Sequence, residues 1–100
     1  MRRARGFIIA ALLATGLPVG ATESLRAAEA LAFNCFTCHG TDGRSPGAMP
    51  GINGKSATYL RSKLRAFRAG EDEPTIMNRI ARAYSDAQID RIARYIAGLR

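Results

Sequence analysis

Two cysteines and the single histidine of this 100-residue chain lie almost side by side, as Cys35, Cys38 and His39. Two thiols three positions apart can each add to one vinyl group of a haem, and the adjacent imidazole can then bind the iron. This spacing is typical of c-type haem attachment. The pattern therefore predicts one covalent haem c, held by Cys35 and Cys38, with His39 as an axial ligand of the iron.

Other uses of these residues must be weighed against haem. A Cys-x-x-Cys pair can be a thiol–disulfide redox centre, but that motif usually accompanies a βαβ pattern, which the sequence lacks. Zinc could bind both thiols and His39, yet a structural zinc site takes four ligands and the chain has no further cysteine or histidine. A disulfide between the two cysteines would close too small a loop to constrain the unfolded chain. Haem attachment is the favoured interpretation.

A haem iron also takes a ligand on the face opposite the histidine, and methionine is the natural candidate because histidine is exhausted. Met49 lies ten residues after His39 in a Gly/Pro-rich stretch, whereas Met77 lies 38 residues after it. The longer connection gives the chain enough length to wrap around the haem. Either methionine alone would be assigned to core packing. Given the haem, the sequence favours Met77 and leaves Met49 as the alternative.

The N-terminal stretch has the layout of a secretory signal peptide. Three arginines precede an apolar run over residues 6–17, and small residues occupy the positions before a cut after Ala21. The run is short for a membrane span, which takes roughly 20 residues. We expect a cleaved signal peptide over residues 1–21 and a periplasmic domain over residues 22–100. A retained membrane anchor is the alternative.

The remaining 79 residues are expected to fold as an all-α domain of three main helices around the haem. So short a chain buries a marginal core, and the cofactor would add apolar surface. The first helix is expected over residues 23–33, directly before the cysteine motif. The second starts after Ser56 as N-cap and ends at Ala69, before Gly70.

The final helix has the clearest sequence signal. Ser85 and Gln88 form a capping box, and apolar residues recur at helical spacing as far as Leu99. A Gly/Pro-rich loop over residues 40–54 connects the first two helices. A second loop, with a short helical turn over residues 76–83, connects the last two.

The chain is basic, with a formal net charge of +7 that falls to +4 without the three arginines of the signal peptide. This balance indicates a partner with an acidic docking surface. Nucleic acid is not expected, because the aromatic residues are assigned to the core and an exported protein meets little of it. A membrane surface is expected as a partner only if the N-terminal segment is retained.

Two groups of arginines could take part in docking. Arg61, Arg65 and Arg68 recur on the second helix, where a solvated face and a docking row are equally open interpretations. Arg79 and Arg82 follow Met77 and should point the same way if their segment is helical. The isoleucines at positions 76 and 80 are then expected on the buried side.

The chain resembles a class I cytochrome c. Three segments carry the resemblance: Phe33-Asn34-Cys35 through Gly40; Met49-Pro50-Gly51-Ile52-Asn53-Gly54 with Tyr59-Leu60; and Thr75-Ile76-Met77-Asn78-Arg79-Ile80-Ala81 with Tyr84-Ser85-Asp86. The second is similar to the cytochrome c4-like group. The third is similar to the cytochrome subunit of flavocytochrome c sulfide dehydrogenase.

The resemblance implies roles for single residues. Met77 matches the distal iron ligand, and Pro50 matches the proline whose carbonyl accepts a hydrogen bond from the proximal imidazole of His39. Tyr95 matches an aromatic that packs across the first helix. The family often has glycine where the two terminal helices cross, whereas this first helix offers only alanines there.

The resemblance further implies electron transfer rather than an enzyme, because Met77 would fill the iron position that substrate chemistry requires. In the first hypothesis the chain is the haem subunit or acceptor of a sulfide-oxidising flavoprotein. In the alternative it is a free-standing carrier between a membrane complex and a terminal oxidase or reductase.

Overall fold

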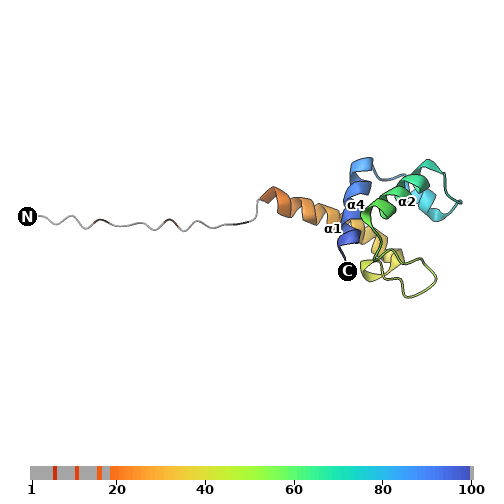
Figure 1. Cartoon of the computed structure of the whole chain (residues 1–100), viewed down its shortest axis with the longest axis horizontal. Coiled ribbons are helices and arrows are strands. Elements are labelled where there is room, and N and C mark those ends of the chain that lie inside the picture. The colour runs from red at the N-terminus through yellow and green to blue at the C-terminus, as the bar shows by residue number, and fades with distance from the viewer. Residues whose placement is uncertain (1–5, 7–10, 12–15, 17–18, 100) are drawn as a thin grey trace, which may run out of the picture.

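The computed structural model describes residues 19–99 together with residues 6, 11 and 16. Its elements are α1 (Val19–His39), the short 3-10 turn η1 (Thr41–Gly43), α2 (Ala57–Ala69), α3 (Ile76–Ala81) and α4 (Asp86–Gly98) (Figure 1). No strand occurs in the described part, and the all-α prediction is confirmed. Of the predicted signal peptide, only residues 6, 11, 16 and 19–21 are described; the rest lies outside the described residues.

Helix α1 is longer than the sequence predicted, because it starts at Val19 and continues through the cysteine motif to His39. No residue between positions 34 and 39 breaks a helix, so the i to i−4 pattern runs on. Gly40 ends it with a φ of 85°, while its N–H still donates to the carbonyl of Phe36. A side chain at Gly40 would meet the carbonyl of Arg44 at 2.8 Å, so this position requires glycine.

The other helix ends follow the predicted signals. Ser56 Oγ accepts a hydrogen bond from the N–H of Tyr59 at the start of α2, and Gly70 ends that helix in the left-handed conformation. Ser85 and Gln88 form the predicted capping box at the start of α4. Local sequence is enough to place these boundaries.

Helix α4 lies at the centre of the fold, packed against α1 on one side and α2 on the other. Its inward residues are almost fully buried: Ile89, Ile92, Ala93 and Ile96. Ala32 of α1, which is 0% exposed, and Leu60 of α2 complete this core cluster. Alanine therefore occupies the contact between α1 and α4. The family that the sequence resembles often has glycine at this crossing.

Ion pairs join α2 to α4 along the edge of this core. Arg61 binds Asp90 at 2.6 Å, and Arg68 binds Asp86 at 2.5 Å. Arg65 lies 3.5 Å from the same Asp86. The arginine row of α2 thus faces acidic partners on α4, which favours neither of the two interpretations left open by the sequence. These charges are neutralised within the fold.

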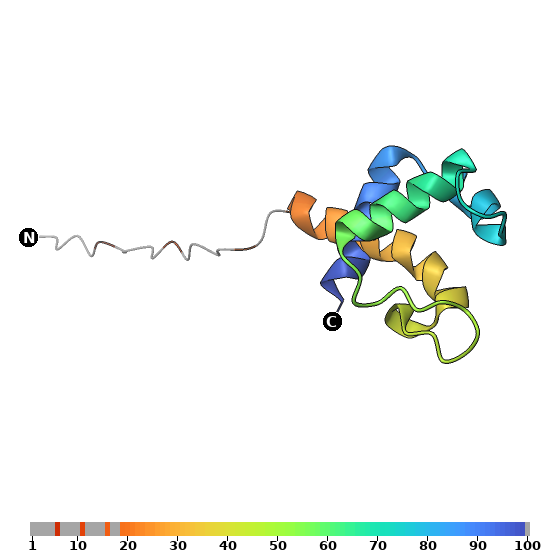
Figure 2. The same ribbon diagram turned by 45° about the vertical axis from the view of Figure 1, so that its right-hand side comes forward.

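The end of the loop that follows α1 is hydrogen-bonded to the start of the same loop. The N–H groups of Ile52 and Asn53 both donate to the carbonyl of Gly43, at 2.9 and 3.2 Å. In both views this loop and α3 lie at the end of the domain opposite the start of α1 (Figure 2). Helix α3 packs against α2. The two segments that carry Met49 and Met77 therefore occupy one end of the molecule.

Candidate haem site

The cysteine motif occupies the last turns of α1. Cys35 and His39 are four residues apart in one helix, and Cys38 is three residues after Cys35, so the three side chains share one side of α1. Cys35 and His39 are half-buried, and Cys38 is exposed. No disulfide joins the two cysteines to each other.

The orientation of the imidazole is set by the loop that follows. Nδ1 of His39 lies 2.6 Å from the carbonyl oxygen of Pro50, eleven residues further along the chain. A carbonyl can only accept, so Nδ1 carries the proton in this hydrogen bond. Nε2 is then the ring nitrogen with a free lone pair. The turn at Gly40 and the return of the loop at Gly43 bring Pro50 to this position.

The environment of the Cys35 thiol differs from that of a typical redox-active cysteine. Burial raises the pKa of the Cys35 thiol, because a desolvated thiolate is costly; a backbone hydrogen bond acts in the opposite, smaller direction. Redox-active cysteines instead have lowered pKa values. In the described part of the chain, no group of three His, Cys, Asp or Glu side chains is placed to hold a metal ion.

The two candidate methionines differ in their surroundings. Met77 lies in the first turn of α3 and is half-buried, and its N–H donates to Thr75 Oγ1. Met49 lies in the loop with its side chain 40% exposed. Helix α3 packs against α2, and α1 packs against α4 and η1, so packing alone does not join Met77 to His39.

Asn78 is a positioning residue that the sequence analysis missed. Its side chain accepts from the N–H of Thr75 at 2.9 Å and donates to the carbonyl of Phe67 on α2 at 3.2 Å. The first of these bonds is half of a second capping box, from Thr75 to Asn78. The spacing of threonine and asparagine was the available signal. Asn78 therefore anchors the helix that carries Met77.

The isoleucines of α3 are not covered by other protein side chains. Ile76 is 58% exposed and Ile80 is 38% exposed. The side of α3 that faces α2 is formed by Ala81, which is buried, and by Asn78. The two isoleucines lie on the other side, where protein atoms leave them open.

Exposed apolar side chains offer a test of whether the site fits a haem. The large hydrophobic residues that protein leaves exposed include Met49 in the loop, Tyr59 in the first turn of α2, and Ile76 and Ile80 of α3. A macrocycle is a large apolar surface, and side chains of this kind are what it would cover. Two free thiols, an imidazole with a free Nε2 and a methionine near such side chains match the donors that haem c takes. The residues present fit the group.

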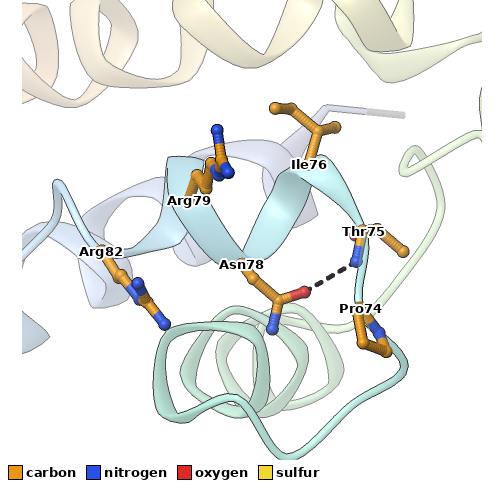
Figure 3. A pocket seen from close by; sticks show the side chains of 6 residues that line it. All are labelled: Pro74, Thr75, Ile76, Asn78, Arg79 and Arg82. Carbon is orange, nitrogen blue, oxygen red and sulfur yellow. Dashed lines mark hydrogen bonds between the residues drawn. The ribbon is translucent and has the colours of Figure 1, made fainter.

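The arginines of α3 also depart from expectation. In Figure 3, Arg79 projects on the same side of α3 as Ile76, whereas Arg82 projects on the side of Asn78, toward α2. The two residues border one groove but do not point the same way. A spacing of three residues does not align their long side chains.

Comparison with known proteins shows which family this chain resembles in sequence. The family model described as cytochrome c matches residues 25–100. The cytochrome subunit of sulfide dehydrogenase from Chlorobaculum tepidum is 41% identical over 71 residues, which are 71% of this chain and 64% of the relative. The thiosulfate dehydrogenase electron acceptor of Stutzerimonas stutzeri is 41% identical over 86 residues, 81% of this chain and 40% of the relative.

A third relative is of similar length. Cytochrome c-554(548) of Halomonas halodenitrificans is 40% identical over 65 residues, 61% of this chain and 78% of the relative. The chain thus spans less than two thirds of the first two relatives. None of the helices that the structure describes combines the length and apolarity needed to cross a membrane.

These comparisons agree with the sequence analysis in family and cofactor. The predicted resemblance to a class I cytochrome c and to the cytochrome subunit of a sulfide dehydrogenase is confirmed. Cytochrome c proteins carry covalent haem c, and Cys35-x-x-Cys38-His39 is the attachment motif, so the cofactor is haem c. With a match that runs from residue 25 to residue 100 and this motif at the end of α1, the chain belongs to the cytochrome c family.

Proposed function

We propose that this chain is a periplasmic mono-haem carrier of single electrons, with Cys35 and Cys38 as the thioether attachments and His39 and Met77 as the axial ligands. When bound, the haem iron supplies reversible one-electron chemistry between its ferric and ferrous states. The protein's own residues orient the ligands and exclude water. If His39 and Met77 both bind the iron, they would leave no position there for a substrate.

One observation carries the proposal, the hydrogen bond between His39 Nδ1 and the Pro50 carbonyl. It fixes the tautomer and the rotation of the ring, and it makes Nε2 a better donor to iron. An imidazole held in this way, one position after a Cys-x-x-Cys pair, serves a c-type haem and has no role in a thiol–disulfide centre. Pro50 is thus proposed as the orienting residue.

Met77 is proposed as the second ligand on the support of its half-buried position and its anchored helix. Thr75 Oγ1 holds the backbone N–H of Met77, and Asn78 ties the same turn to α2. A methionine opposite a histidine raises the reduction potential of a haem. Met49, in a loop and more exposed, lacks comparable support.

The partner is proposed to be a sulfide-oxidising flavoprotein to which this chain is haem subunit or acceptor. The support is the similarity to a protein named as the cytochrome subunit of sulfide dehydrogenase. Another relative is named as the electron acceptor of a thiosulfate dehydrogenase. The first name describes a subunit of a dehydrogenase, and the second describes an electron acceptor of one. Periplasmic location is supported by the N-terminal signal pattern and by the covalent haem.

A free-standing carrier remains the second candidate. The observation that favours it is the Halomonas cytochrome, of which this domain covers 78%, so a relative of this size consists of little more than the domain. Purification of the native protein under mild conditions separates the two candidates. A stoichiometric flavoprotein in the same fraction supports the subunit, and a chain that elutes alone supports the free carrier.

The proposal is tested by expression in a host able to mature c-type cytochromes. Mass spectrometry should show the chain plus one haem, and that mass should survive acid–organic extraction. The absorption spectrum should be that of a six-coordinate low-spin haem. A matured protein with free thiols or a disulfide, and no haem, would end the proposal.

A further inference from the structure

A second pocket, of about 250 Å³, is lined by residues of α1, η1 and α4. Its walls include three aromatic rings and two carboxylates: Phe33 and Phe36 of α1, Tyr95 of α4, Glu29 of α1 and Asp42 of η1. We call it the acidic aromatic pocket. None of the residues proposed to attach, ligate or orient the haem lines it. The proposed electron transfer therefore leaves this pocket without a role.

The pocket and the cysteine motif lie on opposite sides of α1. Phe33 follows Glu29 by four residues and is followed by Phe36 after three, so these side chains share one side of the helix. At about 3.6 residues per turn, the two cysteines and the histidine of the motif centre on the other side. A haem held by the motif therefore extends away from the pocket.

The aromatic rings of the pocket are accessible to a ligand. Phe33 is 65% exposed, and its ring meets that of Phe36 edge to face, with 6.5 Å between the ring centroids. Tyr95 is half-buried and packs against the core cluster. The face of an aromatic ring carries a partial negative charge and attracts cations. Three rings in one pocket therefore favour a cationic ligand.

The carboxylates of the pocket are exposed and act on the same aromatic residue. Neither Glu29 nor Asp42 makes an ion pair with another residue that the structure describes, and Arg26, three residues before Glu29, is not within ion-pair distance of it. Partial desolvation raises the pKa of the Tyr95 hydroxyl, and the charges of Glu29 and Asp42 raise it further. Both carboxylates are therefore close enough to Tyr95 to act on one ligand beside it.

Two features of the backbone strengthen this negative charge. Asp42 has a φ of 54°, a left-handed conformation that aspartate tolerates better than most residues. The pocket also lies beside the last turns of α1, where the helix dipole places partial negative charge. The pocket is thus locally negative, although the chain as a whole is basic.

The chemistry of the walls narrows the class of ligand. Hard metal ions take about six or more oxygen ligands, and the described residues provide no group of three His, Cys, Asp or Glu side chains for a metal. An anion would meet two like charges. The volume is below the roughly 300–1,000 Å³ of sites for drug-sized ligands, so a small ion fits it better. A cation with apolar substituents satisfies both the acids and the rings.

We propose that the acidic aromatic pocket binds a small alkylammonium ion, whose charge faces the two carboxylates and whose alkyl groups lie on the aromatic rings. Quaternary ammonium groups are bound in this way by aromatic side chains, because their charge is weakly hydrated and lies close to the ring faces. Binding of this kind is a property of the domain beyond electron transfer.

The test is a titration of the isotope-labelled, haem-loaded protein with tetramethylammonium chloride, followed by nuclear magnetic resonance. Resonance shifts should saturate and should be largest over residues 29–37, at Asp42 and at Tyr95. A parallel titration with sodium chloride controls for ionic strength. Shifts that do not saturate, or that sodium reproduces, would overturn the proposal.

Substitution of one exposed ring tests the aromatic contribution. Phe33→Ala should raise the dissociation constant of tetramethylammonium about threefold to fivefold, because one cation–π contact is removed. The matched control is Leu25→Ala, an apolar residue that is 64% exposed on the same helix and lies outside the pocket. It should leave the constant unchanged within about twofold. Equal weakening in both variants would show that the rings have no specific role.

A double variant tests the acidic contribution. Glu29→Gln with Asp42→Asn should weaken binding about tenfold, and asparagine keeps the tolerance for a left-handed backbone. Glu71→Gln with Glu73→Gln removes the same charge from an exposed loop and should have less than about a twofold effect. Equal losses in both double variants would reduce the site to an effect of net charge. An unchanged haem absorption spectrum shows that each variant is folded.

A last titration separates a small ion from the side chain of another protein. Acetyl-lysine amide carries an unmethylated, strongly hydrated ammonium group, and it should bind at least about threefold more weakly than tetramethylammonium. Equal or tighter binding of acetyl-lysine amide would overturn the alkylammonium assignment in favour of a lysine from a partner protein.

Discussion

The α2–α4 half of the domain and the end formed by the loop and α3 are built on different principles. Between α2 and α4, three isoleucines are almost fully buried and arginines meet aspartates across the interface. At the other end, Ile76 and Ile80 are open and Arg79 and Arg82 border a groove. The first half is satisfied by the protein's own side chains. The second leaves apolar and charged side chains uncovered by protein.

The difference shows how a chain of this size can form a stable domain. A short chain buries too little apolar surface for every element to be covered by protein. Here the protein-only core is concentrated on α4, and Ile76 and Ile80 of α3 are not covered by protein. Substitutions in the two regions should therefore have effects of different kinds.

The largest expected effect comes from the methionine on α3. Met77→Ala should abolish the thioether-to-iron charge-transfer band. It should also lower the reduction potential, because the soft thioether that favours ferrous iron is removed. Met49→Ala is the matched control and should leave the band in place. Absorption spectra and a redox titration check both variants. Loss of the band in the Met49 variant alone would place the ligand in the loop.

A smaller effect is expected from truncating isoleucines in the two regions. Ile92→Ala leaves a cavity in the protein core and should lower the free energy of unfolding by about 2–4 kcal/mol. Ile76→Ala should cost about 1 kcal/mol in the haem-loaded protein, although protein atoms leave Ile76 58% exposed. Denaturant unfolding measures both. No cost at Ile76 would show that the cofactor does not cover it, and equal costs would remove the contrast between the two regions.

The smallest expected effect is on the pH dependence of stability, through the aspartates of the α2–α4 ion pairs. The hydrogen bond from Arg68 lowers the pKa of Asp86, with help from Arg65, and the hydrogen bonds from Arg94 and Arg61 lower that of Asp90. Since each folded-state pKa lies below its unfolded value, the stabilisation is complete above about pH 4 and disappears as pH falls through the folded-state pKa. Exposure and salt keep the effect modest.

A double variant, Asp86→Asn with Asp90→Asn, isolates the stabilisation that comes from the two carboxylate charges. This variant should be less stable than the wild type near neutral pH, and the two unfolding free energies should converge in acid. A gap that stays constant as pH falls would mean that the carboxylate charges contribute nothing. Added salt should narrow the gap at neutral pH.

The sequence was a good guide wherever the determining signal is local. Ser56, Gly70 and Ser85 set helix ends through neighbours within four residues, and the cysteine motif is likewise contiguous. The extension of α1 through the motif to His39 was missed, because no capping residue marks an end before Gly40. The helix ends only at Gly40, whose positive φ is incompatible with a right-handed helix.

Features that depend on other elements were harder to predict. The spacing of Arg61, Arg65 and Arg68 does not reveal that α4 places two aspartates opposite them. Helical periodicity put Ile76 and Ile80 on an apolar side, but it could not say whether protein or cofactor covers that side. The direction in which Arg79 and Arg82 extend depends on side-chain conformation, which residue spacing does not determine.

The attachment of α3 has a consequence for the order in which the protein opens. The helix is six residues long and is tied to α2 by the Asn78 hydrogen bond and the burial of Ala81. Local opening of such a segment requires far less free energy than global unfolding, so its amides should exchange with solvent while α4 stays protected. If Met77 binds the iron, as proposed, it would dissociate and rebind with this opening, whereas the proposed attachments at Cys35 and Cys38 on α1 would hold the haem throughout.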